Sequence, residues 1–198
     1  MKQFIKLTSR IVPLPIENVD TDQIIPARFL KDTSKIGYKK YLFHDWRFDA
    51  DGKPKAEFVL NNPTYTGEIL LAGKNFGSGS SREHAAWAIA DYGFRVVISS
   101  YFADIFKNNA MNNGVLPIVV SEGFLSNLFK SIENDNKATV SVCLENQTVR
   151  NDATGETEHF DINAYKKECF LNGYDDIDYL LANKDKIEEY EKKLLTPN

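Results

Sequence analysis

Short apolar runs alternate with helix-favouring segments through the centre of the chain. Three runs are almost wholly hydrophobic, which is typical of strands buried on both faces: residues 68–72, 94–99 and 115–120. Helical patterns occupy the intervals between them, at residues 81–92 and 102–112. Gly93 and Gly114 follow these segments as helix stops. The order β-α-β-α-β predicts an α/β fold with a central parallel sheet covered by helices and joined by right-handed crossovers.

Weaker patterns flank this centre. Partial alternation over residues 4–12 predicts a first strand, which Pro13 and Pro15 would end. The later part of the chain predicts, in order, a helix at 124–133, a strand at 139–145, a return near 148–150, a turn at 155–158 and a helical tail at about 163–195. Glu and Lys residues lie three and four apart in that tail, as on a solvated helix face, and we assign no function to it.

Composition narrows the class of protein. The 198 residues are 42% hydrophobic and 26% charged, so we expect one globular domain over residues 1–198. The net charge of −4 and the lack of a dense basic patch argue against nucleic acid or an anionic membrane as partner. No apolar run approaches the ~20 residues of a membrane span, and the first residues lack the core of a signal peptide. We therefore expect a cytoplasmic protein.

The glycine-rich stretch 73–84 (GKNFGSGSSREH) lies between a predicted strand and a predicted helix. Ser80 and Glu83 have the spacing of a capping box, which places the helix start at about Ser81. A helix start attracts carboxylate or phosphate, and Arg82 adds a cation that can hold a carboxylate through two hydrogen bonds. A small di- or tricarboxylic acid would suit this chemistry. Alternatively, Ser80 only caps, Arg82 pairs with a surface acid and the glycines close a turn.

Four ordered motifs together resemble a known family. They are FGSGSSREHA at 76–85, TDQIIPARFL at 21–30, DYGFRVVI at 91–98 and FADIFKNNAMNNG at 102–114. Over most of the chain the sequence closely resembles the small subunits of 3-isopropylmalate dehydratases, which correspond to the swivelling β/β/α-type domain of the aconitase superfamily. Residues 79–83 (GSSRE) match the signature of that superfamily in this domain.

The resemblance implies a hydro-lyase that turns 2-isopropylmalate into 3-isopropylmalate in leucine biosynthesis, by dehydration and rehydration. It also implies a heterodimer or larger complex, in which a separate large subunit holds a four-iron four-sulfur cluster. Such clusters need several cysteine thiolates at suitable spacing. This chain has only Cys143 and Cys169, well separated, so we expect it to bind no cofactor itself and to be inactive alone.

Site roles follow from the same resemblance. Ser80 would be the base that removes a carbon-bound proton, Ser81 would bind a substrate carboxylate and Arg82 would clamp the substrate. Thr21 and Asp22 match a pair that reaches the active site, with Asp22 facing the catalytic machinery of the partner. The alternative is that residues 20–22 only form a turn, because such side chains bond to nearby backbone.

Arg28 resembles a second substrate-binding arginine, at a shorter spacing than in aconitase. Ile24 or Ile25 stands where aconitase has a further serine, which is consistent with an isopropyl substituent on the substrate, and residues 29–34 would help to select that substituent. Selection by one methylene is worth only about 1 to 3 kcal/mol, so homoaconitate or a methyl-substituted malate stays open as substrate. A non-catalytic module that only binds an anion is the other alternative.

Other singled-out residues receive structural interpretations. We take Ser78 as structural and His84 as a packed histidine, and we assign no metal to His44 or His159. The aromatic segment 38–51 suits either the core or a surface that faces the partner.

Overall fold

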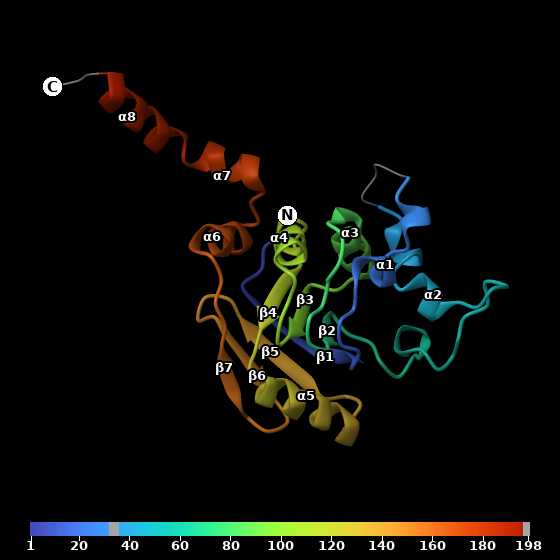
Figure 1. The fold of residues 1–198 in the computed structure, drawn as a ribbon. Coiled ribbons are helices and arrows are strands. Elements are labelled where there is room, and N and C mark those ends of the chain that lie inside the picture. Colours follow the sequence, from blue (N-terminus) through green and yellow to red (C-terminus); the bar gives the residue numbers. More distant parts are fainter. Residues whose placement is uncertain (32–35, 196–198) are drawn as a thin grey trace.

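The computed structural model describes residues 1–31 and 36–195. It contains a curled seven-stranded mixed sheet in the order β4-β3-β2-β1-β5-β6-β7 (Figure 1). The strands are β1 (Lys6–Leu14), β2 (Ile69–Ala72), β3 (Val96–Ser99), β4 (Leu116–Val119), β5 (Thr139–Cys143), β6 (Thr148–Asn151) and β7 (Thr157–His159). The predicted α/β fold class is confirmed.

Strand β1 joins a parallel half of the sheet to an antiparallel half. On one side it pairs in parallel with β2, which pairs in parallel with β3 and so to β4. On its other side it pairs with β5 in antiparallel register, followed by β6 and β7. The predicted parallel centre is therefore confirmed, and the later strands form an antiparallel extension.

The prediction that Pro13 ends the first strand is wrong. Strand β1 continues to Leu14, and Pro13 lies opposite Leu71 of β2. Strand β5 pairs only with Lys6–Arg10, so one edge of β1 has no ladder partner beyond that point. A proline, which has no N–H to donate, is tolerated at such an edge.

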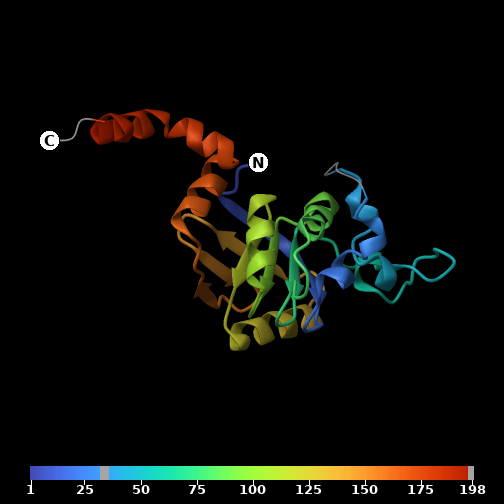
Figure 2. The same cartoon turned by 45° about the horizontal axis from the view of Figure 1, so that its top comes forward.

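Helices cover both faces of the sheet. The α-helices in the described residues are α1 (Thr21–Ile24), α2 (His44–Arg47), α3 (Glu83–Tyr92), α4 (Asp104–Asn112), α5 (Glu122–Asn134), α6 (Ala164–Asn172), α7 (Asp176–Ala182) and α8 (Lys184–Leu195). Helices α3 and α4 pack on one face of the parallel half and α5 packs on the other (Figures 1 and 2). The last two helices leave the body beside α6 and project away from it in both views. None of the helices in the described residues is both long and hydrophobic enough to cross a lipid bilayer.

Two hydrophobic cores result from the alternation of side chains along the strands. Ile69 and Leu71 of β2 face α5, whereas Leu70 and Ala72 face α3 and α4. We call these the α5 core and the α3 core. Because every residue of β2 is fully buried, its continuous apolar run is explained by burial on both faces.

The most hydrophobic residues of the aromatic segment 38–51 lie in the α3 core. Tyr38 and Phe43 are fully buried, and Trp46 stacks on Phe43 with ring centroids 5.4 Å apart. Of the two interpretations from the sequence, burial in the core describes these residues. Tyr41 and Phe48 remain half-buried.

Candidate functional site

The site begins where the segments that follow β1 and β2 meet. The two strands are parallel neighbours, so their carboxyl ends lie at the same edge of the sheet, where ligands commonly bind. We call residues 73–82 the serine loop. Its backbone is tied to the segment after β1, because Thr21 N–H donates to the Ser78 carbonyl at 2.9 Å and Gly77 N–H donates to the Val19 carbonyl at 2.8 Å. Ser78 contributes its backbone carbonyl to this link, and the interpretation of its side chain as structural stays a prediction.

Glycines set the path of the serine loop. Gly77 and Gly79 have left-handed backbone angles, with φ of 78° and 87°. A Cβ atom on Gly77 would lie 2.2 Å from Cγ of Phe106, so no larger residue fits against α4 at this point. The loop therefore needs glycine at residue 77 both for its backbone angle and for close packing.

The predicted capping box and helix start are wrong. Helix α3 begins at Glu83, its N-cap residue is Arg82 and no side chain caps it. Instead of reaching back to Ser80, the Glu83 carboxylate accepts hydrogen bonds from Trp87 Nε1 at 3.1 Å and Asn113 Nδ2 at 3.2 Å. Packing against α4 has thus taken the glutamate away from the cap.

This later start leaves both serines exposed in the loop rather than in the helix. Within the part of the chain that the structure describes, the hydroxyls of Ser80 and Ser81 have no hydrogen-bond partner. The backbone N–H groups of Gly79, Ser80 and Ser81 likewise donate to no acceptor there. Three unpaired N–H groups beside two hydroxyls offer hydrogen bonds to an anion.

Arg82 lies beside these groups and is largely buried, with a side chain only 14% exposed. Its Nη2 donates to Oδ2 of Asp22 at 2.6 Å, and its Nη1 forms an ion pair with Oδ1. Nη1 is buried and makes no hydrogen bond of good geometry within the described residues. The hydrogen bond from Arg82 holds the pKa of Asp22 below its usual value, against the opposing effect of burial. A carboxylate of this chain therefore already occupies the predicted clamp.

Segment 20–22 shows both of the roles that the sequence left open, since one of its residues organises the turn and the others lie at the candidate site. Asp20 is structural, since it caps α1 and forms a capping box with Gln23. Thr21 is 3% exposed, and its hydroxyl donates to the Ser80 carbonyl at 2.8 Å. Thr21 positions the serine loop, whereas Asp22 is 56% exposed and faces Arg82.

Among the described residues, no contact joins Arg28 to Ser80 or Ser81. It forms a bidentate ion pair with Asp45 of α2, and its guanidinium lies over the ring of Phe29 at 4.6 Å. The hydrogen bond to Asp45 raises the pKa of Arg28. Asp45 was missed in the sequence, where it is one acid within an aromatic segment and carries no motif.

The residues expected to select the substrate substituent lie in different environments. Ile24 and Ile25 are fully buried in the α3 core, so neither presents a surface to a ligand in this structure. Phe29 stacks on Tyr41 with centroids 4.2 Å apart. Residues 32–34 of the expected selectivity loop lie outside the described residues.

The histidines and cysteines do not gather at the site. His84 packs on Trp87 with ring centroids 4.4 Å apart, as expected of a packed histidine. Cys143 is on β5 and Cys169 is buried on α6. Among residues 1–31 and 36–195, no group of three or more His, Cys, Asp and Glu side chains could hold a metal ion. The donor set of these residues does not fit an iron-sulfur cluster.

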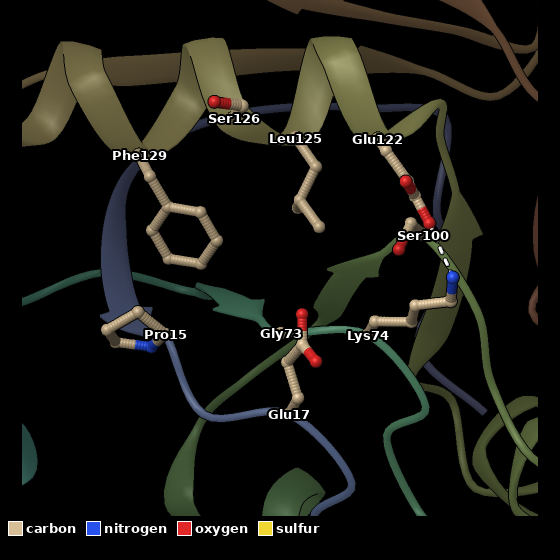
Figure 3. Close-up of a pocket in the computed structure, with 9 residues that line it drawn as sticks. All are labelled: Pro15, Glu17, Gly73, Lys74, Ser100, Glu122, Leu125, Ser126 and Phe129. Carbon is tan, nitrogen blue, oxygen red and sulfur yellow. Dashed lines mark hydrogen bonds and ion pairs between the residues drawn. The ribbon is translucent and has the colours of Figure 1, made fainter.

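A separate cavity of about 450 Å³ opens at the start of the serine loop (Figure 3). Leu125 and Phe129 of α5 point into it, and Lys74 reaches across its edge to Glu122. None of the predicted site residues lines this cavity. We place the candidate site at Ser80 and Arg82, because unpaired hydrogen-bond donors and a buried cation gather there.

Comparisons with known proteins show which family the chain belongs to. The chain matches the family model of the aconitase C-terminal domain over residues 1–123. It is 66% identical to the 3-isopropylmalate dehydratase small subunit of Azobacteroides pseudotrichonymphae, with 97% of this chain and 98% of that one covered. It is 62% identical to the small subunit of the same name from Cytophaga hutchinsonii, with 97% and 96% covered.

A solved structure gives the same result. The crystal structure of 3-isopropylmalate dehydratase from Methanocaldococcus jannaschii is 26% identical and has a TM-score of 0.64, with 95% of this chain and 99% of that chain covered. The chain therefore belongs to the aconitase C-terminal domain family and, within it, to the small subunits of 3-isopropylmalate dehydratase.

Proposed function

We propose that this chain joins a large subunit to convert 2-isopropylmalate into 3-isopropylmalate, a dehydration and rehydration that serves leucine biosynthesis in the cytoplasm. One observation carries the proposal in a chain of this family. The exposed hydroxyl of Ser80 lies in a loop with unpaired N–H groups, next to the buried guanidinium of Arg82. These are the parts needed to hold a carboxylate and to move a proton beside it.

In this proposal Ser80 removes the proton from the substrate carbon as the general base. A serine hydroxyl is a weak base in water, so its alkoxide needs nearby positive charge, hydrogen-bond donors and the exclusion of water. Arg82 supplies the charge, and the N–H groups of Gly79 and Ser81 supply donors. The large subunit would exclude water by closing over the exposed serine loop.

Arg82 and Ser81 would hold substrate carboxylates, and Thr21 would keep the loop in register. Because Asp22 now pairs with Arg82, a substrate carboxylate has to compete with it or displace it. We propose that Asp22 turns toward the large subunit when the complex forms, which frees the guanidinium. Arg28 would join the substrate only if it also exchanged Asp45 for a ligand.

Residues 1–31 and 36–195 offer no ligand set for a cluster. We therefore keep the four-iron four-sulfur cluster as a proposed part of the large subunit, where it would act as a Lewis acid on the substrate hydroxyl when bound. The isolated chain is then expected to be inactive.

Substitution of Ser80 by alanine tests the proposal in the complex reconstituted with the large subunit. Loss of a general base is expected to lower kcat by about 10²-fold to 10⁴-fold, with assembly unchanged. Ser81→Ala serves as the comparison, because loss of a binding hydroxyl raises KM more than it lowers kcat. Full turnover by Ser80→Ala would show that another group is the base.

Assays of the same reconstituted complex distinguish two alternative functions. Turnover of homoaconitate or a methyl-substituted malate in preference to isopropylmalate would move the proposal to a related hydro-lyase. A module that only binds an anion would show ligand affinity without turnover of any of these acids.

A further inference from the structure

The last two helices expose an unusual amount of hydrophobic surface. We call residues 176–195, which form α7 and α8, the C-terminal arm. Ten large hydrophobic side chains are exposed in the described part of the chain, and half of them belong to the arm: Ile177 (68%), Leu180 (57%), Leu181 (66%), Ile187 (40%) and Tyr190 (64%). Apolar surface gathered in one place on a soluble protein commonly marks a contact with another molecule.

The spacing of these residues favours a binding face rather than scattered exposure. Ile177, Leu180 and Leu181 lie three and four residues apart, so they share one face of α7. Ile187 and Tyr190 are three apart on α8. The charged residues of α8 form ion pairs within the helix, as between Lys193 and Glu189 at 2.7 Å, and stabilise it without a tertiary neighbour.

The body holds only the beginning of the arm. Asp175 caps α7, and Lys166 of α6 donates to Asp176 at 2.9 Å. Tyr179 packs edge-on against Tyr165 of α6, with centroids 4.5 Å apart. Beyond that contact the arm extends away from the sheet and its covering helices (Figures 1 and 2). The base is thus held in place, while the five apolar side chains of the arm remain 40% to 68% exposed.

The base of the arm borders the same side of the molecule as the candidate site. One cavity of about 300 Å³ is lined both by Ile177 at the start of the arm and by Glu83, the residue that follows Arg82. A partner that closes over Ser80 and Arg82 therefore approaches the point at which the arm begins.

The small-subunit relatives align over the residues of the arm. The aconitase C-terminal domain model ends at residue 123. The small subunits of Azobacteroides and Cytophaga align over 193 and 192 residues, which leaves too few unaligned positions to exclude the arm. A domain that is a separate chain has to hold its partner through surface contacts alone. An arm that carries an apolar face outside the shared domain meets this need.

We propose that the C-terminal arm docks its apolar face, centred on Leu180 and Leu181, onto the large subunit. The inference rests on the proposed function only in its choice of partner. The arm acts in assembly and takes no part in the proton transfer.

A binding measurement tests this with the full chain and its purified large subunit. In Leu180→Gln/Leu181→Gln, two apolar contacts are lost, and we expect the dissociation constant to rise roughly tenfold to hundredfold. Both side chains are exposed, so the far-ultraviolet circular dichroism of the isolated variant should match the parent chain. Glu188→Gln/Glu189→Gln is the matched control, because it places the same amides on the polar side of the arm, and its affinity should be unchanged.

Activity separates this inference from the proposed function. At a saturating concentration of the Leu180→Gln/Leu181→Gln chain, kcat should return to the parent value. An unchanged dissociation constant would overturn the docking proposal even if Ser80→Ala abolished turnover. Weakened binding in a complex that turns over no isopropylmalate would support the docking and overturn the proposed function. Light scattering that shows a dimer of the isolated chain, lost in the leucine variant alone, would assign the face to a second copy and overturn the proposal.

Discussion

A missing side chain at residue 77 decides where the catalytic candidates lie. Gly77 touches the first turn of α4 so closely that an added Cβ would lie 2.2 Å from Phe106, and its φ of 78° is costly for any other residue. From this point the loop runs to Ser80 and Arg82. The position of two chemically important residues thus depends on a third that has no chemistry of its own.

We predict that Gly77→Ala lowers the free energy of unfolding by about 2–4 kcal/mol, since backbone strain and overpacking add together. Gly52→Ala is the control, because Gly52 has nearly the same φ of 77° but nothing within 4 Å of the added Cβ. It should cost only about 1 kcal/mol. Urea denaturation of both variants measures the difference. Equal losses would show that the contact with Phe106 relaxes without cost.

The ion pair between Asp22 and Arg82 makes a small, pH-dependent contribution to stability. Their hydrogen bond lowers the pKa of Asp22, so the pair stabilises the fold above the ordinary Asp pKa of 3.8 and loses that contribution as the pH falls through the lowered value. The carboxylate is 56% exposed, and solvent screening keeps such a pair below about 1 kcal/mol. A ligand can therefore displace Asp22 at a small cost in free energy.

Among the elements, α5 is fixed to the antiparallel half of the sheet by its first residue. The Ser121 hydroxyl accepts a hydrogen bond from Phe124 N–H at 3.1 Å as the N-cap and donates to Glu158 of β7 at 2.7 Å. Glu158 also accepts from Ser121 N–H at 2.6 Å. One serine therefore both starts the helix and links it to the edge strand.

Substitution of Ser121 by alanine is expected to cost about 1–2 kcal/mol, from the loss of the cap and of the bond to Glu158. Ser126→Ala on the exposed side of the same helix should change stability by less than about 0.5 kcal/mol. Thermal unfolding of the two variants compares them directly. If Ser121→Ala matched Ser126→Ala, water would be replacing the cap at no cost.

On the scale of the whole molecule, strand β1 is the only strand shared by the parallel and antiparallel halves within the described residues. The α3 core and the α5 core lie on opposite faces of this sheet. Both tryptophans of the chain, Trp46 and Trp87, belong to the α3 core or pack against it. Tryptophan fluorescence therefore reports on one core alone, while circular dichroism reports on the whole chain.

Because both tryptophans lie on one face of the sheet, a mutation on the other face can test whether the chain unfolds as the single domain that the sequence predicts. Leu128→Ala removes a fully buried side chain from the α5 core and should cost about 2–5 kcal/mol. In a cooperative unit the fluorescence midpoint moves with the dichroism midpoint, although the mutation is on the opposite face from both tryptophans. A fluorescence transition that stayed in place would mean that the two halves unfold separately.

The parallel centre could be predicted from the sequence, because short apolar runs, helical spacing and glycine stops are local signals that all indicate the same elements. The family could be predicted as well, through motifs that extend from residue 21 to residue 114. Predictions from the sequence are wrong where a contact made in the folded chain replaces a local preference. Glu83 leaves the predicted capping box for Trp87 and Asn113, and β1 runs through Pro13 because β5 stops pairing at Arg10.

The contacts of the candidate site residues could be learned only from the folded chain. Spacing could not show that Asp22 fills the Arg82 clamp across 60 residues, or that Arg28 is held by Asp45. Nor could it show that the helical tail leaves its apolar side uncovered. These features depend on which strands become neighbours and how much surface remains for the last helices to cover, and both are settled by packing of the whole chain rather than by any local pattern.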